Sequence, residues 1–350
     1  MAKKTTKHDG ARPASKPTTQ EASWPWIAML GGLLLLTVVM VVLALLPERN
    51  GNPATDSTTL PSGAPGVTAP VVDDSNTQTM RIVKAGTAYV EKKTTAGTVF
   101  SLRKGDRVEV VEMDHEWVTI AVEGRGYYLP RNMVRGLDEH VIVIDAGHQL
   151  REDIGKEPVG PGSSDEVQKM DVGHVGVNTS QQEYDVTLNV ALKLRAELES
   201  RGYTVYLTRS SNAVAISNKE RADVANNLYA DAYISLHAGF SEDASVHGLG
   251  AICQTADNSY IADLYSDNKA LCTTILNELV KTTENKNQGI RENDKLAGIN
   301  WCQVPVAMLE VGYLSNENDD RLLSGQQYHE KLAKGIANGL DAFFAEKDKK

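Results

Sequence analysis

The sequence predicts an α/β fold for its C-terminal part, residues 139–346, in which helices flank a mostly parallel sheet. Two observations predict this fold. Short apolar runs alternate with segments whose apolar residues recur at helical spacing, which is typical of a parallel sheet covered by helices. Polar residues able to do chemistry also stand at the ends of three of these runs, where an open α/β sheet forms its ligand crevice.

The N-terminal region contains the most apolar segment of the chain. Residues 26–46 are 21 residues without a charge, which matches the roughly 20 needed for a transmembrane helix. Five basic residues against two acidic ones in residues 1–25 predict a cytoplasmic tail, with everything after the span outside the membrane. A cleaved signal peptide, which would leave the protein secreted, is the alternative. The length of the run and the lack of an A-x-A site disfavour it.

Two short regions connect this span to the α/β part. Residues 47–79 hold five prolines among Thr, Ser, Gly, Ala and Asp, without a hydrophobic period, and predict a disordered linker. Residues 80–138 contain short β-rich runs separated by glycine-containing turns, which predict a small all-β barrel.

The barrel region resembles a bacterial SH3 (SH3b) domain. The resemblance rests on KGDRVEVVE, on Trp117 at the start of the next strand, and on G-Y-Y before Met133-Val134. It implies a module that binds cell-wall peptide or glycan. The usual Asn-Val-Arg-Ser-Gly-Pro opening segment is replaced by AYVEKKTTAG. Because of this difference, the resemblance does not identify the ligand of the module. A spacer without a binding role is the alternative, because fold alone does not fix function.

The α/β part begins with an apolar strand over residues 141–144. A helix is predicted over residues 183–201, because Tyr184, Leu188, Ala191, Leu194 and Leu198 share one face and Gly202 then stops it. The other expected elements are strands over 203–208, 231–236, 248–255 and 305–310, and helices through 221–225, over 262–281 and over 329–344.

Two imidazoles and two carboxylates are the candidate site residues: His148, Glu183, His237 and Glu310. His148 and His237 both follow apolar strands, so they are expected at one sheet edge. Glu310 ends an apolar run, where an ionised carboxylate is costly unless paired or at a site. Two imidazoles and two carboxylates would suit one zinc ion and one general base.

Glu183 and two residues near the candidate site have competing interpretations. Glu183 ends Ser180-Gln-Gln-Glu183, a capping box, and spacing alone favours the cap over a metal ligand. Asp145 could orient an imidazole or cap its turn. His174, in the long loop between His148 and Glu183, is expected to face solvent and not to bind metal.

From Val141 to Phe344 seven motifs follow one another along the chain: VIVIDAGH, EYDVTLN, RGYTVYLTR, SNKERADVAN, ADAYISLHA, RENDKLAGI and PVAMLEVGYLSN. In this order they resemble the zinc-dependent N-acetylmuramoyl-L-alanine amidases of the Amidase_3 family. The resemblance implies zinc ligands at His148, Glu183 and His237 and a catalytic glutamate at Glu310. It also implies peptidoglycan as the substrate, cut between N-acetylmuramic acid and L-alanine by zinc-activated water.

The chain departs from this family in two places. The family commonly reads His-Ala-Asn after the second histidine, whereas here Ala238 is followed by Gly239-Phe240. The segment over residues 149–182 is long and rich in Gly and Pro, as in an active-site loop that shapes a cleft. Arg221 and Arg291 lie in family-like motifs, with salt-bridged structural roles and substrate contacts both left open.

Other functions remain as alternatives: another cell-wall zinc hydrolase, such as a peptidase or deacetylase, or a catalytically silent wall-binding or regulatory protein. An activating partner is also left open by the sequence. The formal net charge of −10 argues against nucleic acid as a partner, because phosphate binding needs a basic face. Three cysteines without a C-x-x-C pair predict small buried residues with at most one disulfide: Cys253, Cys272 and Cys302.

Overall fold

The computed structural model describes residues 69–347 and 349. The basic tail, the transmembrane helix expected over residues 26–46 and most of the linker therefore lie outside the described residues. Among the residues that are described, no helix is long and apolar enough to cross a membrane.

The first part of the described chain is an antiparallel sheet, and its strands lie in the region where β-rich runs are predicted. Seven strands follow one another in the spatial order β3-β2-β6-β5-β4-β1-β7. The strands share a common core, which includes Ile82, Val118, Ile120 and Leu129, and along the first half of β4 exposed and buried residues alternate. The strands are β1 (Gln78–Ile82), β2 (Gly86–Tyr89), β3 (Thr98–Leu102), β4 (Arg107–Met113), β5 (Trp117–Val122), β6 (Arg125–Pro130) and β7 (Val134–Gly136), with a 3-10 turn η1 (Arg131–Met133) before the last.

This all-β part starts earlier than the boundary expected at residue 80. Ala69 is buried in its core, and the backbone of Pro70 and Val72 bonds to Gly126 and Gly124 at 2.8 and 3.1 Å. The polar composition of residues 69–79 gave no sign of this, because backbone hydrogen bonds do not depend on side-chain hydrophobicity. The predicted linker therefore does not reach residue 79, because the chain from residue 69 on belongs to the all-β part.

The second part is built on a mixed sheet of order β11-β8-β12-β15-β13-β14. β11, β8, β12 and β15 are parallel; β13 runs antiparallel to β15 and parallel to β14. The predicted, mostly parallel sheet flanked by helices is thus present. Its strands are β8 (Val141–Ala146), β11 (Thr204–Leu207), β12 (Ala232–Gly239), β13 (Leu249–Cys253), β14 (Asn287–Glu292) and β15 (Val306–Tyr313).

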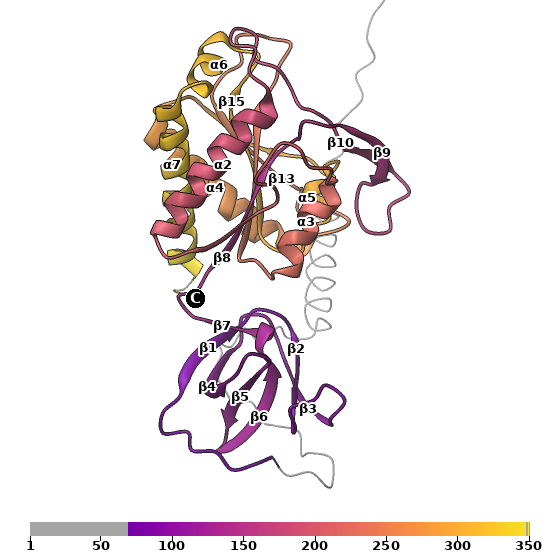
Figure 1. Ribbon diagram of the computed structural model, residues 1–350, viewed down its shortest axis with the longest axis vertical. Helices are drawn as coiled ribbons and strands as arrows, with labels where there is room; N and C mark the ends of the chain where they lie inside the picture. Colours follow the sequence, from indigo (N-terminus) through magenta and orange to yellow (C-terminus); the bar gives the residue numbers. More distant parts are fainter. Residues whose placement is uncertain (1–68, 348, 350) are drawn as a thin grey trace, which may run out of the picture. The chain divides into compact units, whose positions relative to one another are not determined.

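Helices cover both faces of this sheet, which explains why its central strands are apolar on both sides (Figure 1). Ile142 and Ile144 pack into the core cluster under α2, α4 and α7, whereas Val141 and Val143 pack toward α3 and α5. The helices are α2 (Glu183–Ser200), α3 (Asn218–Asn227), α4 (Tyr265–Thr283) after the 3-10 turn η2 (Ala262–Leu264), α5 (Ala297–Asn300), α6 (Glu317–Leu323) and α7 (Gln326–Lys347).

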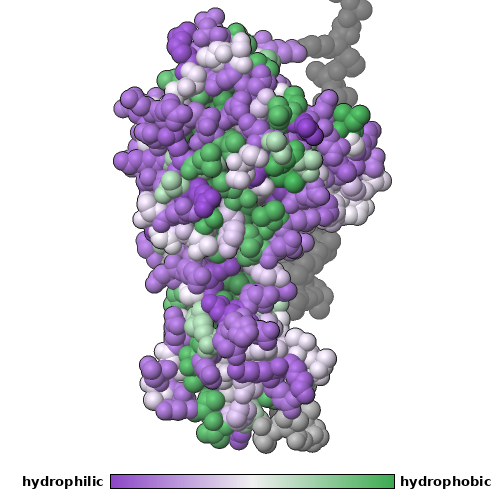
Figure 2. Space-filling model, in the orientation of Figure 1, coloured by the Kyte–Doolittle hydropathy of each residue, from purple (hydrophilic) through white to green (hydrophobic). Residues whose placement is uncertain are grey.

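Apolar residues are gathered mainly in these core clusters. On the face that Figure 2 shows, hydrophilic residues predominate and apolar residues form smaller patches between them. All three cysteines are buried free thiols, so they are small core residues as expected and form no disulfide among the described residues.

The chain order places a topological switch point beside β8. From β8 the chain passes through α2 to β11 on one side, and then through α3 to β12 on the other side. α2 and α3 cover opposite faces of the sheet, so β8 and β12 end at the position where open α/β sheets typically bind their ligands. The chain following β8 carries His148, and the end of β12 carries His237.

The long segment between His148 and Glu183 is partly a hairpin, β9 (Asp153–Pro158) and β10 (Glu166–Met170). The hairpin is fastened to the α3 and α5 side: Trp301 Nε1 donates to Pro158 O at 2.8 Å, and Lys219 N donates to Glu157 Oε1 at 3.2 Å. Only the residues after β10 return to the end of β8. The expected active-site loop is therefore an anchored hairpin followed by a short return segment.

The contact between α4 and α7 gives a stability prediction. A Cβ on Gly339 of α7 would overlap Ile275 Cα of α4 and lie 2.8 Å from its backbone nitrogen. We expect Gly339→Ala to lower the free energy of unfolding by about 1–3 kcal/mol, because the two helices must move apart. Gly298→Ala in α5 is the matched control, since its Cβ would meet nothing within 4 Å. Urea unfolding of both variants measures this, and equal midpoints would contradict it.

Candidate metal centre

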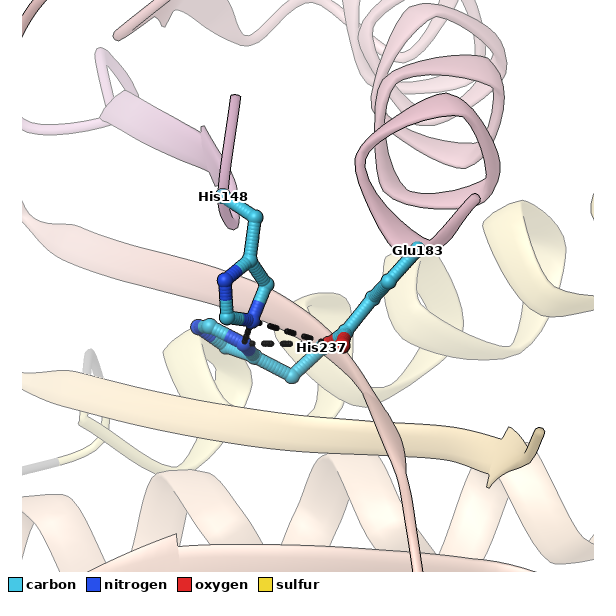
Figure 3. Close-up of side chains that lie close together, drawn as sticks. All are labelled: His148, Glu183 and His237. Carbon is cyan, nitrogen blue, oxygen red and sulfur yellow. Dashed lines mark hydrogen bonds and ion pairs between the residues drawn. The ribbon is translucent and has the colours of Figure 1, made fainter. Parts of the chain in front are cut away.

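Three predicted residues meet at the switch point: His148, Glu183 and His237 (Figure 3). His148 Nε2 lies 3.1 Å from Glu183 Oε1, and His237 Nδ1 lies 3.4 Å from the same oxygen. The two ring nitrogens are 3.0 Å apart. One ligand atom from each residue lies within 4.8 Å of the others, so a single ion could contact all three.

His148 sits in a strained turn that two buried arginines hold. Its φ of 60° is uncommon for a residue other than glycine. Arg209 donates to Ala146 O at 2.7 Å and to Gly147 O at 2.9 Å. Arg221 donates to Ala146 O at 2.8 Å and to His148 O at 3.0 Å. These bonds fix three successive carbonyls and thereby aim the His148 ring.

Asp145 supports the same turn through Arg221. Its Oδ1 accepts from Arg221 Nη1 and Thr208 Oγ1, both at 2.7 Å, and its Oδ2 accepts from Ser235 Oγ at 2.9 Å. Burial raises the pKa of Asp145, but Arg221 and Thr208 lower it more, to about 2. Asp145 therefore neither orients an imidazole nor caps its turn, which were the two roles considered from the sequence. Arg221 has the structural role, because it forms a buried ion pair with Asp145.

Gly147 leaves room for the second histidine. A Cβ at this position would lie 2.5 Å from His237 Cε1 and 2.7 Å from His237 Nε2. Any larger residue would push the ring out of the site, so the glycine before His148 is required by close approach.

Glu183 lies beneath the two histidines at the first position of α2, with 1% of its side chain exposed. The capping box expected from Ser180 and Glu183 is not formed: the N-cap is Gln182, without a side-chain cap bond, and Ser180 has a φ of 60°. The carboxylate instead accepts from the backbone N–H groups of Ala238 and His174, both at 2.9 Å. It is thus held from two sides and directed at the histidines.

The charges of the site favour a cation. Burial raises the pKa of Glu183, but hydrogen bonds from His148 and His237 lower it further, well below its usual range. Burial lowers the pKa of His148, but the carboxylates of Asp171 and Glu183 raise it more, to about 10. Without a metal, a proton on His148 supplies the positive charge that the carboxylates require.

Asp171 is a site residue that the sequence analysis missed. Its carboxylate pairs with His148 Nδ1 from the return segment after β10, and this contact lowers the pKa of Asp171. Carboxylates commonly hold the far nitrogen of a metal-binding histidine, which leaves the other nitrogen for the metal. An exposed aspartate in a loop gives no periodic signal, so spacing could not have found it.

Arg209 was missed as well, although its position held a signal. It follows the β11 run TVYL at the same sheet edge as His148. A buried charged residue that follows a strand at this edge is either functional or, as here, a support for the site.

Glu310 lies on the strand next to His237 and outside the group of three. The two residues are in register on β15 and β12, so their side chains project from the same face of the sheet. Its carboxylate accepts from Arg291 Nη2 at 2.5 Å and from Tyr313 OH at 3.0 Å. The sequence left open whether Arg291 forms a structural salt bridge or contacts substrate. In the structure it forms an ion pair with the predicted catalytic glutamate.

His174 lies outside the group of three, and its side chain is exposed, as expected. Its backbone supports Glu183, while its ring stacks on Phe240 with centroids 4.5 Å apart. Phe240 is also exposed, so the two rings form an aromatic surface beside the site.

The donor set fits a divalent transition metal. Two imidazoles and one carboxylate provide three ligands and leave a position for substrate or water. The side chains of His148 and His237 are 13% and 22% exposed, so that position opens to solvent while Glu183 closes the site from below.

Residues 142–342, more than half of the chain, match the Amidase_3 family, described as N-acetylmuramoyl-L-alanine amidase. This chain belongs to that family. Membership makes the protein a peptidoglycan hydrolase of the amidase class. It also explains why the sequence motifs between β8 and β15 occur in the order that is typical of the family.

Two relatives carry amidase names, and one solved structure shares the fold. N-acetylmuramoyl-L-alanine amidase Rv3717 of Mycobacterium tuberculosis is 29% identical over 217 residues, which cover 59% of this chain and 86% of that protein. The probable cell wall amidase LytH of Staphylococcus aureus is 24% identical over 253 residues, covering 71% and 78%. The crystal structure of the amidase Ami1 of Mycobacterium smegmatis has the same fold, with a TM-score of 0.54 at 21% identity, covering 59% and 97%.

The geometry predicts which residues of the amidase retain metal. We expect His148→Ala, Glu183→Ala and His237→Ala each to lose most of the bound metal, because each removes one of three ligands. His174→Ala is the control: it removes a nearby histidine ring but leaves the backbone bond to Glu183. Atomic spectrometry on the dialysed full chain measures metal content, and full retention in any of the three ligand variants would contradict the assignment.

The raised pKa of His148 predicts a pH-dependent metal affinity. Below pH about 10 the metal-free site holds a proton on His148, and a metal must displace it. The affinity should therefore rise with pH, by about tenfold per unit for one displaced proton. Asp171→Asn should weaken this dependence, because it removes one carboxylate that holds the proton. Chelator competition between pH 6 and 8, corrected for the chelator's own protonation, tests this; an affinity independent of pH would refute it.

Proposed function

We propose that this amidase hydrolyses the amide bond between N-acetylmuramic acid and the L-alanine of the stem peptide, with one zinc ion held by His148, Glu183 and His237. The observation that carries the proposal is the convergence of these three donors at the switch point of an amidase domain. Two imidazoles and a carboxylate are a common ligand set of catalytic zinc. Bound there, zinc would polarise the scissile carbonyl and lower the pKa of water.

The residues around the metal have separate tasks in this proposal. Glu310 accepts the proton of the attacking water as the new C–O bond forms. It then gives that proton to the stem-peptide nitrogen as the C–N bond breaks, which releases a free amine and leaves a carboxylic acid on the lactyl group, which ionises by losing its proton to water. A carboxylate has about four acceptor sites, so the bonds from Arg291 and Tyr313 leave room for this proton.

We also propose that the stacked rings of His174 and Phe240 form one wall of the substrate cleft. The rings are exposed, and their backbones adjoin Glu183 and the end of β12. Ligand sites are mostly lined by apolar and aromatic groups with a few polar ones. The replacement of the family's Asn by Gly239 before Phe240 would then alter the cleft next to the metal.

The remaining regions are proposed to bring the enzyme to its substrate. The antiparallel sheet over residues 78–136 would act as an SH3b-like module that binds the cell wall. The LytH match supports a shared region before the catalytic domain, since it covers 71% of this chain whereas the family match covers residues 142–342. The uncharged run over 26–46 and the basic tail before it support a single-pass anchor with the enzyme on the outer face of the cytoplasmic membrane.

Glu310→Gln tests the proposed base. Glutamine keeps the shape of the side chain but cannot take up a proton, so we expect the hydrolysis rate to fall at least about 100-fold. Metal content should not change. Glu317→Gln, an exposed glutamate of α6, is the matched control and should retain the wild-type rate.

Mass spectrometry of fragments released from purified peptidoglycan measures this rate and identifies the bond that is cut. Unchanged hydrolysis by Glu310→Gln would remove the base assignment. Fragments cut within the stem peptide, or glycans that lose acetate, would identify a peptidase or a deacetylase instead.

A further inference from the structure

We propose that Tyr313 is a positioning residue for Glu310, and that Gly239 is present because the Tyr313 ring occupies the space of its side chain. The proposal rests on the proposed role of Glu310 as the base.

The first support is a buried hydrogen bond to the carboxylate. Tyr313 OH donates to Glu310 Oε2 at 3.0 Å, and only 7% of Tyr313 is exposed. Burial and the nearby charge of Glu310 raise the pKa of Tyr313 to about 12. The phenol therefore keeps its proton at neutral pH and remains a donor to the carboxylate.

The second support is a bulge that turns Tyr313 toward Glu310. Residues three apart in a regular strand face opposite sides of the sheet. Here Glu310 pairs with His237 and Tyr313 pairs with Gly239, so β15 uses three steps where β12 uses two. The extra residue returns Tyr313 to the face of Glu310, which is a common use of bulges near active sites. Gly312 makes this possible with a φ of 142°.

The third support is the fit between Tyr313 and Gly239. A Cβ on Gly239 would lie 2.7 Å from Tyr313 Cε1 and 2.8 Å from Cδ1 and Cζ. The ring therefore lies directly against the backbone of Gly239, and the asparagine that the family commonly has here would displace it. Gly239 and Tyr313 act as a matched pair on neighbouring strands.

The two partners of Glu310 differ in how firmly they hold it. The Arg291 side chain is 61% exposed, so its ion pair is open to water and weakened by screening. The phenol is buried and its ring is fixed by Gly239. Tyr313 therefore sets the position of one carboxylate oxygen, and small displacements of a reacting group reduce the rate strongly.

Tyr313→Phe tests the proposal, since it keeps the ring against Gly239 and removes only the hydroxyl. We expect kcat to fall about tenfold, with KM and metal content unchanged, because Tyr313 acts on Glu310 and not on the substrate. Tyr328→Phe is the matched control: Tyr328 is also 7% exposed and bonds through its hydroxyl to Asn285. It lies in α7, and its variant should keep the wild-type kcat.

A second variant, Gly239→Asn, displaces the ring without removing the hydroxyl and should lower kcat by a similar factor. Its metal content is measured as well, because Gly239 lies two residues after His237. A wild-type kcat for Tyr313→Phe, a change confined to KM, or a loss of metal from Tyr313→Phe would each overturn the proposal. Glu310→Gln separates this from failure of the base assignment: if that variant stays active, Glu310 is not the base, whatever Tyr313 does.

Discussion

The candidate metal centre depends on the hydrogen bonds that two buried guanidinium groups donate to the turn after β8. Arg209 and Arg221 together bond the carbonyls of residues 146–148, and Arg209 also donates to Tyr184 O at 2.8 Å. One side chain thus ties the turn of His148 to the first turn of α2, which carries Glu183. Asp145 balances the charge of Arg221, since a buried cation without a partner is strongly destabilising. Two of the three metal donors are therefore positioned by one polar network beneath the sheet edge.

The same site is arranged so that a positive charge is needed at its centre. Glu183 is buried and ionised, and Asp171 holds the outer nitrogen of His148. In the metal-free site the proton on His148 satisfies these carboxylates, and a bound metal would replace that proton. The three donors are therefore positioned without a metal. Backbone N–H groups and arginines hold them in place, so the ion is not needed to do so.

The sequence predicted the elements that follow from periodicity and missed those that follow from local backbone geometry. His148 and His237 could be predicted because parallel strands end at one edge. Glu183 was ambiguous, since a cap and a ligand can both stand at a helix start. The structure excludes the capping box, because Gln182 and not Ser180 is the N-cap, and it makes no side-chain cap bond. Asp171 and the pairing of Tyr313 with Glu310 carried no spacing signal. The first lies in a loop, and the second depends on a bulge that reverses the expected alternation.

The bulge in β15 also connects the strand of Glu310 to neighbouring elements. Tyr313 N and Gly248 N both donate to Asp319 Oδ2, at 2.9 and 2.7 Å, so the bulged end of β15 is tied to α6 and to the start of β13. Asp320, the next residue, accepts from Asn178 N and Thr179 N at 2.7 and 2.8 Å, on the segment that leads into Glu183. Two adjacent aspartates of α6 therefore hold the strand of Glu310 and the approach to Glu183 in one frame. The proposed base Glu310 and the candidate metal ligand Glu183 are on separate elements, yet a shift of either would strain the same short helix.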